Sequence, residues 1–148
     1  MDVAGFDHVN LTVREFGESV AWYRRVFRFS LVEEGVWEGV RWGVLRSGSG
    51  HGPAMLCIYE RPEYRPTDGE ALRDLGLHGV RHFGLRIEDE AEWRRVLSRE
   101  GLEAEERRWP RSTSWYVNDP TGYDIEVAYW HDGRVDFAPA GQDGKEKR

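Results

Sequence analysis

Residues 6–13 read FDHVNLTV, and residues 80–87 read VRHFGLRI. Each stretch has a histidine at its third position, and apolar residues alternate with other residues from that point on. This alternation is typical of a half-buried β-strand, and it places His8 and His82 on the face opposite the apolar residues. Two strands of one pattern, each with a histidine near its start, indicate an internal repeat that sets the architecture.

Matching segments follow both of these strands. Amphipathic helices are predicted for residues 18–28 and 89–99, because apolar side chains recur there at spacings of one, three and four. Three short strand-like segments follow each helix: 30–36, 40–46 and 54–60 in the first half, and 103–108, 113–118 and 123–130 in the second. The repeated unit is therefore β-α-β-β-β.

The repeat divides the chain into two modules, a linker and a tail. The modules cover residues 1–60 and 80–136, and the Pro- and Gly-containing stretch 61–79 predicts a linker with a short helix at 70–75. Residues 137–148 have almost nothing to bury and are predicted to be disordered. We expect an α+β fold in which the two modules form one curved, cup-like mixed sheet, with helices on the outside and the function on the polar inner face.

Length and charge limit the kind of partner. A chain of 148 residues is the length of one ordinary domain. Its 21 basic and 27 acidic residues give a net charge of −6 with both signs mixed, which argues against nucleic-acid or membrane-surface binding and favours a small-molecule substrate. Because Cys57 cannot form an internal disulfide, and no leader or membrane span is recognised, we expect a cytoplasmic protein.

The longest local motif is WYVNDPTGYDIEV at residues 115–127. It predicts a hairpin, in which an aromatic strand reaches a turn at 119–122 and a second strand returns. Glu126 in the returning strand lies between Ile125 and Val127. A carboxylate among apolar neighbours is costly unless it is paired or bound to a cation.

Over roughly residues 4–130 the chain resembles the vicinal-oxygen-chelate superfamily, which includes the glyoxalases, bleomycin-resistance proteins and extradiol dioxygenases. The resemblance rests on the histidine at the start of each module and on the Asp-Pro-x-Gly hairpin that ends in Ile-Glu. It implies that His8, His82 and Glu126 bind one divalent metal ion. Two imidazoles and a carboxylate suit Fe(II) or Mn(II), with Zn(II) or Ni(II) as alternatives. The resemblance also implies a homodimer, and it leaves open whether the cup closes within one chain or across two.

One further position, that of a fourth metal ligand, distinguishes the branches of this superfamily. Glyoxalase I has a fourth ligand, a glutamate in the last strand of the first module. Aligning the last strands of the two modules puts Leu56 at that position and turns Cys57 toward the helix, so the four-ligand site looks broken. A shifted register would bring Glu60 nearby instead.

Two branches use three ligands, namely the extradiol dioxygenases and the fosfomycin-resistance enzymes that add a thiol to an epoxide. In both, a functional tyrosine maps onto Tyr116, which we predict to transfer a proton or orient the substrate. The catalytic histidine of the dioxygenases has no counterpart in the stretch 107–111. Its arginines, Arg107, Arg108 and Arg111, either bind an anionic substrate or form a solvated strand edge.

Two hypotheses about function remain open at this point. The first is a metal-dependent dioxygenase, lyase or transferase whose substrate offers two adjacent oxygens to the metal. The second is a metal-free protein that binds and sequesters a flat, antibiotic-like molecule in an aromatic cup. The metal content of the purified protein distinguishes the two.

Overall fold

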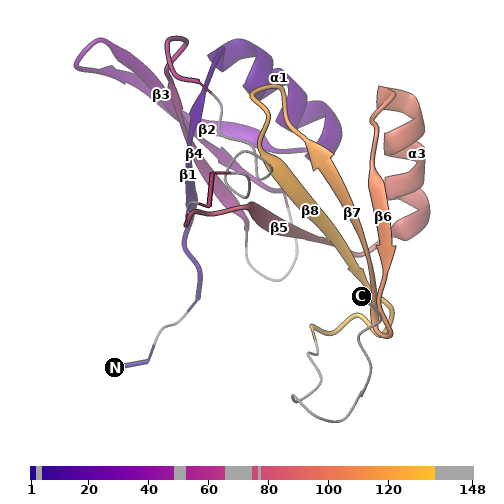
Figure 1. Ribbon diagram of the computed structural model, residues 1–148. Helices are drawn as coiled ribbons and strands as arrows, with labels where there is room; N and C mark the ends of the chain where they lie inside the picture. Colours follow the sequence, from indigo (N-terminus) through magenta and orange to yellow (C-terminus); the bar gives the residue numbers. More distant parts are fainter. Residues whose placement is uncertain (3–4, 49–52, 66–74, 77, 136–148) are drawn as a thin grey trace.

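The computed structural model describes residues 1–148 except 3–4, 49–52, 66–74, 77 and 136–148. The first module contains β1 (Val9–Val13), α1 (Phe16–Phe27), β2 (Ser30–Trp37), β3 (Val40–Arg46) and β4 (Met55–Glu60). The second contains β5 (His82–Ile87), α3 (Glu90–Glu100), β6 (Glu105–Arg108), β7 (Ser112–Asn118) and β8 (Asp124–Trp130). Both β-α-β-β-β units predicted from the repeat are therefore present (Figure 1).

Two of the predicted segments lie mostly or wholly outside the described residues. The short helix predicted at 70–75 lies, except for Leu75, outside the described residues, and so does the tail at 137–148. Within the described part of the chain, no helix is long and apolar enough to cross a membrane.

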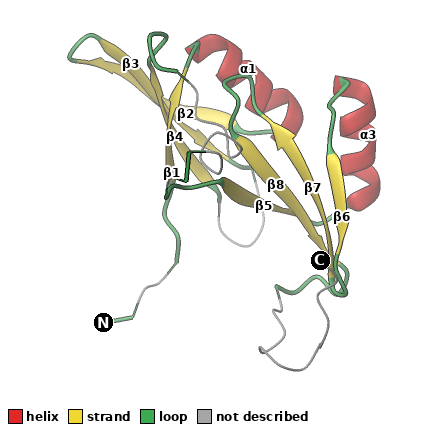
Figure 2. Cartoon of the chain, in the orientation of Figure 1, coloured by secondary structure: helices red, strands yellow, loops and turns green. Residues whose placement is uncertain are grey.

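The two modules repeat the same strand order. The first sheet runs β1-β4-β3-β2 and the second runs β5-β8-β7-β6. In each sheet the first and last strands of the module are parallel neighbours, and all other pairs are antiparallel. The predicted α+β fold of two mixed-sheet modules is confirmed: the described residues form two four-stranded sheets, with β1 and β5 each at one edge (Figures 1 and 2).

The apolar faces of the two modules meet in one core. Its buried members come from both helices, both sheets and the segment between α1 and β2: Leu11, Val13, Phe16, Trp22, Tyr23, Val26, Phe29, Leu45, Leu56, Ile58, Trp93, Val96, Trp115, Val117, Ile125 and Val127. Phe27 of α1 stacks on Trp93 of α3 with ring centroids 5.5 Å apart. The helices therefore lie on the apolar face of each sheet, which in the second sheet is opposite His82 as predicted, and the apolar faces of the two modules pack against each other.

The predicted turn at 119–122 joins the second module to the first. The Asp119 carboxylate accepts hydrogen bonds from the backbone N–H groups of Thr121, Gly122 and Tyr123 at 2.8–2.9 Å. Its second oxygen accepts from the Tyr23 hydroxyl of α1 at 3.0 Å. Burial raises the pKa of Asp119, although these donors oppose the shift. The turn thus has its local hydrogen bonds satisfied and fixes the start of β8, the strand that carries Glu126.

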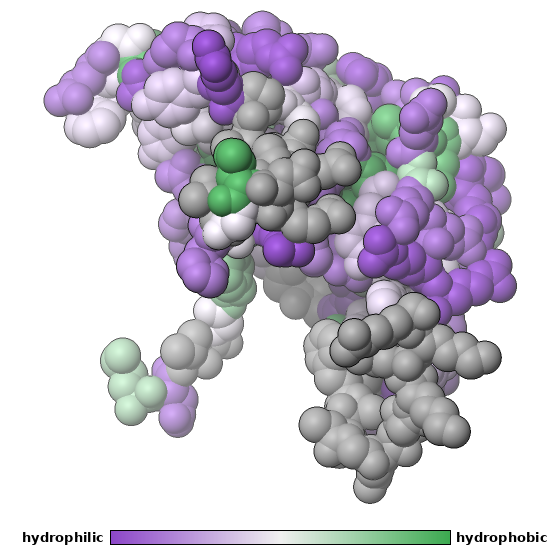
Figure 3. Space-filling view, in the orientation of Figure 1, coloured by the Kyte–Doolittle hydropathy of each residue, from purple (hydrophilic) through white to green (hydrophobic). Residues whose placement is uncertain are grey.

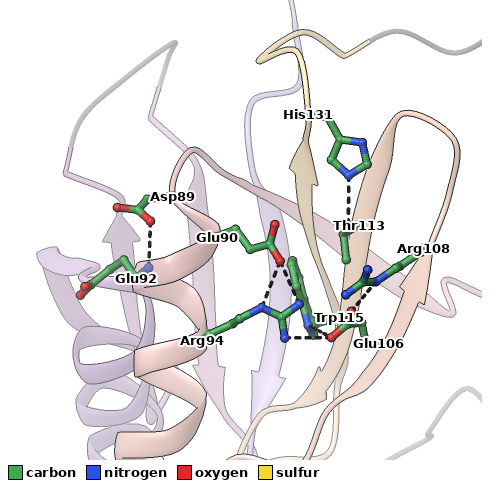
Figure 4. Close-up of polar contacts among 9 residues, drawn as sticks. All are labelled: Asp89, Glu90, Glu92, Arg94, Glu106, Arg108, Thr113, Trp115 and His131. Carbon is green, nitrogen blue, oxygen red and sulfur yellow. Dashed lines mark hydrogen bonds and ion pairs between the residues drawn. The ribbon is translucent and has the colours of Figure 1, made fainter.

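Charged side chains cover the outer surface of the helices, which agrees with the largely hydrophilic face seen in Figure 3. One network among them ties α3 to the second sheet (Figure 4). Glu106 of β6 accepts hydrogen bonds from Arg94 of α3 at 3.0 Å, from Arg108 at 2.9 Å and from the buried Trp115 indole at 3.1 Å. Hydrogen bonds from Arg94 and then Arg108 lower the pKa of Glu106 to about 2.

We expect this network to make the free energy of unfolding decrease as the pH falls in the acid range. A carboxylate whose pKa is lower in the folded chain contributes fully above its ordinary value of 4.5, and the contribution is lost as the pH falls toward about 2. Glu106→Gln should therefore lower the melting temperature at pH 7 and flatten its decline between pH 5 and pH 2. Thermal unfolding measures this, with Glu105→Gln as the control on the same strand. An unchanged acid profile in Glu106→Gln would contradict the assignment.

Candidate functional site

The second module brings two of the three predicted metal ligands together. His82 begins β5 and Glu126 lies in β8, and the parallel register pairs His82 with Asp124 and Gly84 with Glu126. His82 and Glu126 are therefore diagonal neighbours on one face, and His82 Nε2 lies 3.1 Å from Glu126 Oε2. The other carboxylate oxygen accepts a hydrogen bond of 2.6 Å from the Ser114 hydroxyl. An imidazole nitrogen and an oriented carboxylate oxygen thus converge.

Tyr116 lies on the same face, as its alternation in the strand predicted. It is paired with Glu126 across β7 and β8, and its ring meets the His82 ring edge-on with centroids 5.6 Å apart. Burial, followed by the negative charge of Glu126, raises the pKa of Tyr116, while Arg107 opposes the shift. The phenol therefore keeps its proton at neutral pH and can donate a hydrogen bond beside Glu126.

His8 is separate from this group. It precedes β1, its side chain is exposed, and its Nδ1 lies 2.8 Å from Asp7 Oδ2. Among the described residues no three His, Cys, Asp or Glu side chains come close enough to hold a metal ion. The residues fit a divalent metal in part: one chain supplies the nitrogen and oxygen of His82 and Glu126, and His8 is not with them.

The first module corrects the predicted position of the fourth ligand. Val9 pairs with Leu56 in the first sheet, and the equivalent Phe83 pairs with Ile125 in the second. Leu56 therefore corresponds to Ile125, and Cys57 corresponds to Glu126. The predicted alignment was wrong by one residue, and one residue reverses the face of every side chain in a strand.

Burial agrees with the corrected register. Leu56 is 1% exposed and belongs to the core, so it does not line the polar face as predicted. Cys57 is only partly buried and is not part of the core, so it does not face the helix as predicted. Burial, followed by the charges of Asp7 and Glu33, raises the pKa of the Cys57 thiol.

A cavity of about 620 Å³ opens beside Glu126 and Tyr116. Its remaining lining comes from β5, the loop between β6 and β7, β7, β8 and the segment after β8: Gly84, Leu85, Arg86, Trp109, Pro110, Arg111, Ser112, Ser114, Ala128, Trp130 and Val135. The alternation of β5 had placed Arg86 on the His82 face. Nothing in the sequence identified Trp109 and Val135 as lining residues, because both lie in irregular segments.

The three arginines of the stretch 107–111 have different positions. Arg107 is bound to Glu105 at 2.8 Å and lies against the Tyr116 ring, 5.1 Å from its centroid. Arg108 is bound to Glu106. Of the three, only Arg111 lines the cavity. Arg107 and Arg108 therefore form ion pairs along β6, which favours the interpretation of these two as part of a solvated strand edge.

Solved structures with the same fold were found by comparison. A glyoxylase/bleomycin resistance protein/dioxygenase domain from Frankia sp. EAN1pec has a TM-score of 0.71 at 19% identity, covering 90% of this chain and 96% of that one. A mutant of the fosfomycin resistance protein FosX from Listeria monocytogenes, complexed with Mn(II) and 1S,2S-dihydroxypropylphosphonic acid, has a TM-score of 0.67 at 14% identity, covering 87% and 94%. A lactoylglutathione lyase from Agrobacterium tumefaciens has a TM-score of 0.58 at 24% identity, covering 87% and 96%.

These identities establish likeness of fold alone. No curated protein gives a significant match to the chain. The family described as Glyoxalase/Bleomycin resistance protein/Dioxygenase superfamily matches residues 5–127, which is most of the chain and extends from before β1 into β8. The repeat of two β-α-β-β-β modules and this match together show that the chain belongs to the glyoxalase/bleomycin resistance protein/dioxygenase superfamily.

Proposed function

We propose that the chain is a divalent-metal-dependent enzyme that acts on a small substrate with two adjacent oxygens. The observation that carries the proposal is the convergence of His82 and Tyr116 on Glu126, beside a cavity that Glu126 and Tyr116 line. In this proposal His82 and Glu126 hold the metal, and Ser114 orients the carboxylate through its 2.6 Å hydrogen bond. The bound metal would supply Lewis-acid polarisation of the substrate oxygens. Mn(II) in the related FosX structure supports a divalent ion of this kind.

We propose that a second copy of the chain supplies His8. Two ligands alone leave a metal readily displaced by water, so a third is needed. His8 directly precedes β1 and His82 begins β5, and both strands are sheet edges with unpaired backbone groups in the described residues. Pairing of β1 from one copy with β5 from another, repeated by two-fold symmetry, would bring the histidines together and cover both edges.

Tyr116 is the proposed proton donor to the substrate. Tyr116 lines the cavity beside Glu126, where its phenol can hydrogen-bond to a substrate oxygen that gains negative charge during the reaction. Such a contact lowers the barrier because it is stronger in the transition state than in the ground state. This role fits both thiol-transferase and dioxygenase chemistry, and the fold likeness to FosX favours testing the first of these before the second.

Metal analysis of protein purified without chelator tests the metal-dependent proposal directly. About one metal ion per chain supports the enzyme. A chain with no metal, even after anaerobic reconstitution with Fe(II) or Mn(II), supports the alternative proposal of a metal-free binding protein. The aromatic lining of the cavity by Trp109 and Trp130 is the observation that favours this alternative.

Once a substrate is found, Tyr116→Phe is expected to lower kcat while leaving metal content and KM nearly unchanged. Loss of one preorganised donor typically raises the barrier by about 2.7–4 kcal/mol, a factor of about 10²–10³ in rate. Tyr129→Phe in β8 is the matched control, because Tyr129 packs against the core on the opposite face. Wild-type turnover in Tyr116→Phe would remove the phenol from the reaction.

A further inference from the structure

We propose that the cavity beside Glu126 selects a planar aromatic substrate with an anionic group, whose charge is held by Arg86. The inference rests on the proposed function, since it names the substrate class of that site. Three features of the cavity support it: a floor of small residues, exposed apolar walls, and an arginine, Arg86, two residues further along the sheet than Glu126.

The floor of the cavity is made of small side chains. Gly84, Ala128, Ser112 and Ser114 all line it, and the sheet register places Gly84 and Ala128 next to Glu126 and Ser114. A Cβ atom added at Gly84 would meet only the Glu126 carbonyl oxygen, at 4.0 Å. Since the strand residues beside the Glu126 carboxylate leave open space, a flat molecule can lie against the sheet.

The walls offer apolar surface to the solvent. Trp109 is 49% exposed and Val135 is 52% exposed, and both line the cavity together with Trp130. An indole face is large, rigid and suited to stacking on another ring. Exposed apolar surface gathered around one cavity is typical of a ligand site rather than of an ordinary surface. The ligand it would cover is a planar ring system.

Arg86 supplies the charge for the second half of the proposal. It faces the same side of β5 as His82, lines the cavity, and has no carboxylate partner among the residues that the structure describes. It pairs with Ala128, two residues beyond the Gly84–Glu126 pair, so its Cα lies roughly 6–7 Å further along the strand. A guanidinium binds a carboxylate through two parallel hydrogen bonds. One ring can span the distance between the metal ligands and such an anion.

Calorimetric titration of the full chain with three probes tests this inference. The protein is stripped of metal with EDTA and titrated with 2-naphthoate, with the neutral 2-naphthamide, and with the saturated decahydro-2-naphthoate. We expect 2-naphthoate to bind most tightly, because only this probe has both the flat ring and the charge. Equal affinity for the aromatic and the saturated acid would overturn the proposal.

Variants then assign the two contributions. Arg86→Gln should weaken 2-naphthoate binding about tenfold or more and leave 2-naphthamide unchanged, while Arg95→Gln, on the exposed face of α3, should change neither. Trp109→Leu should weaken both aromatic probes, and Trp109→Phe should restore part of the loss. An Arg86→Gln protein with wild-type affinity for 2-naphthoate would overturn the assignment of Arg86.

The outcome is distinguishable from failure of the proposed function. Because the titration is made without metal, naphthoate binding by a chain that cannot bind metal would contradict the enzyme and keep the aromatic-anion site. Stoichiometric metal binding without naphthoate binding would contradict the aromatic-anion site alone.

Discussion

His8→Ala and Glu126→Gln proteins are each expected to lose most of their bound metal, and an equimolar mixture of the two is expected to recover part of it. In the proposed two-copy site, His8 comes from one chain and the His82–Glu126 pair from the other. A mixed dimer therefore contains one intact site, with His8 of the Glu126→Gln chain beside the intact pair of the His8→Ala chain. If half of all dimers are mixed, the mixture regains roughly a quarter of the wild-type sites.

The control uses two changes in the same half-site. A mixture of His82→Ala and Glu126→Gln should recover no metal, because each pairing of chains leaves every site with a missing ligand. Metal content by mass spectrometry, after subunits are exchanged in mild denaturant and desalted, measures both mixtures. Equal recovery in the two mixtures, or none in either, would contradict a site shared between chains. Full metal binding by either single variant would contradict the ligand itself.

The second large effect is a difference in stability between a glutamate placed at position 56 and one placed at position 57. Leu56→Glu places a carboxylate in the core, where the parent side chain is 1% exposed, and it should cost several kcal/mol because the charge has no partner there. Marginal stability of about 5–15 kcal/mol leaves little to absorb such a loss. Leu56→Gln should also destabilise, since an amide in the same place lacks partners. Urea unfolding of both variants measures the loss.

Cys57→Glu should behave in the opposite way. The side chain at 57 lies on the polar face and corresponds to Glu126 of the second module, so the new carboxylate is expected to be tolerated. It would stand on the His8 side of the proposed shared site, as a fourth oxygen donor, and should strengthen Zn(II) or Ni(II) binding. Cys57→Gln is the control, because it keeps the volume without the charge. A stable Leu56→Glu beside an unfolded Cys57→Glu would contradict the register.

Much of the fold follows from alternation and repetition along the chain. The first strand of each module, both helices and the hairpin at 115–127 all have the predicted type, because each pattern is local and the period of the apolar residues identifies a helix or a strand. The repeat also indicates that the two modules have the same strand order, since similar sequences bury their apolar residues in the same arrangement. Glu126 and Tyr116 share a face because alternation and a short turn constrain them together, and His82 joins them through the parallel pairing of β5 with β8.

The remaining features depend on contacts between distant segments. The pairing of β1 with β4 is parallel and not set by a turn, so the sequence did not determine its register. As a result, Leu56 and Cys57 each lie on the face opposite to the predicted one. The separation of His8 from the His82–Glu126 pair arises because the helix-covered faces of the modules pack on one core, which turns the polar faces away from it. Alternation assigns a side chain to a face of its own strand, and only the packing of the modules determines what that face meets.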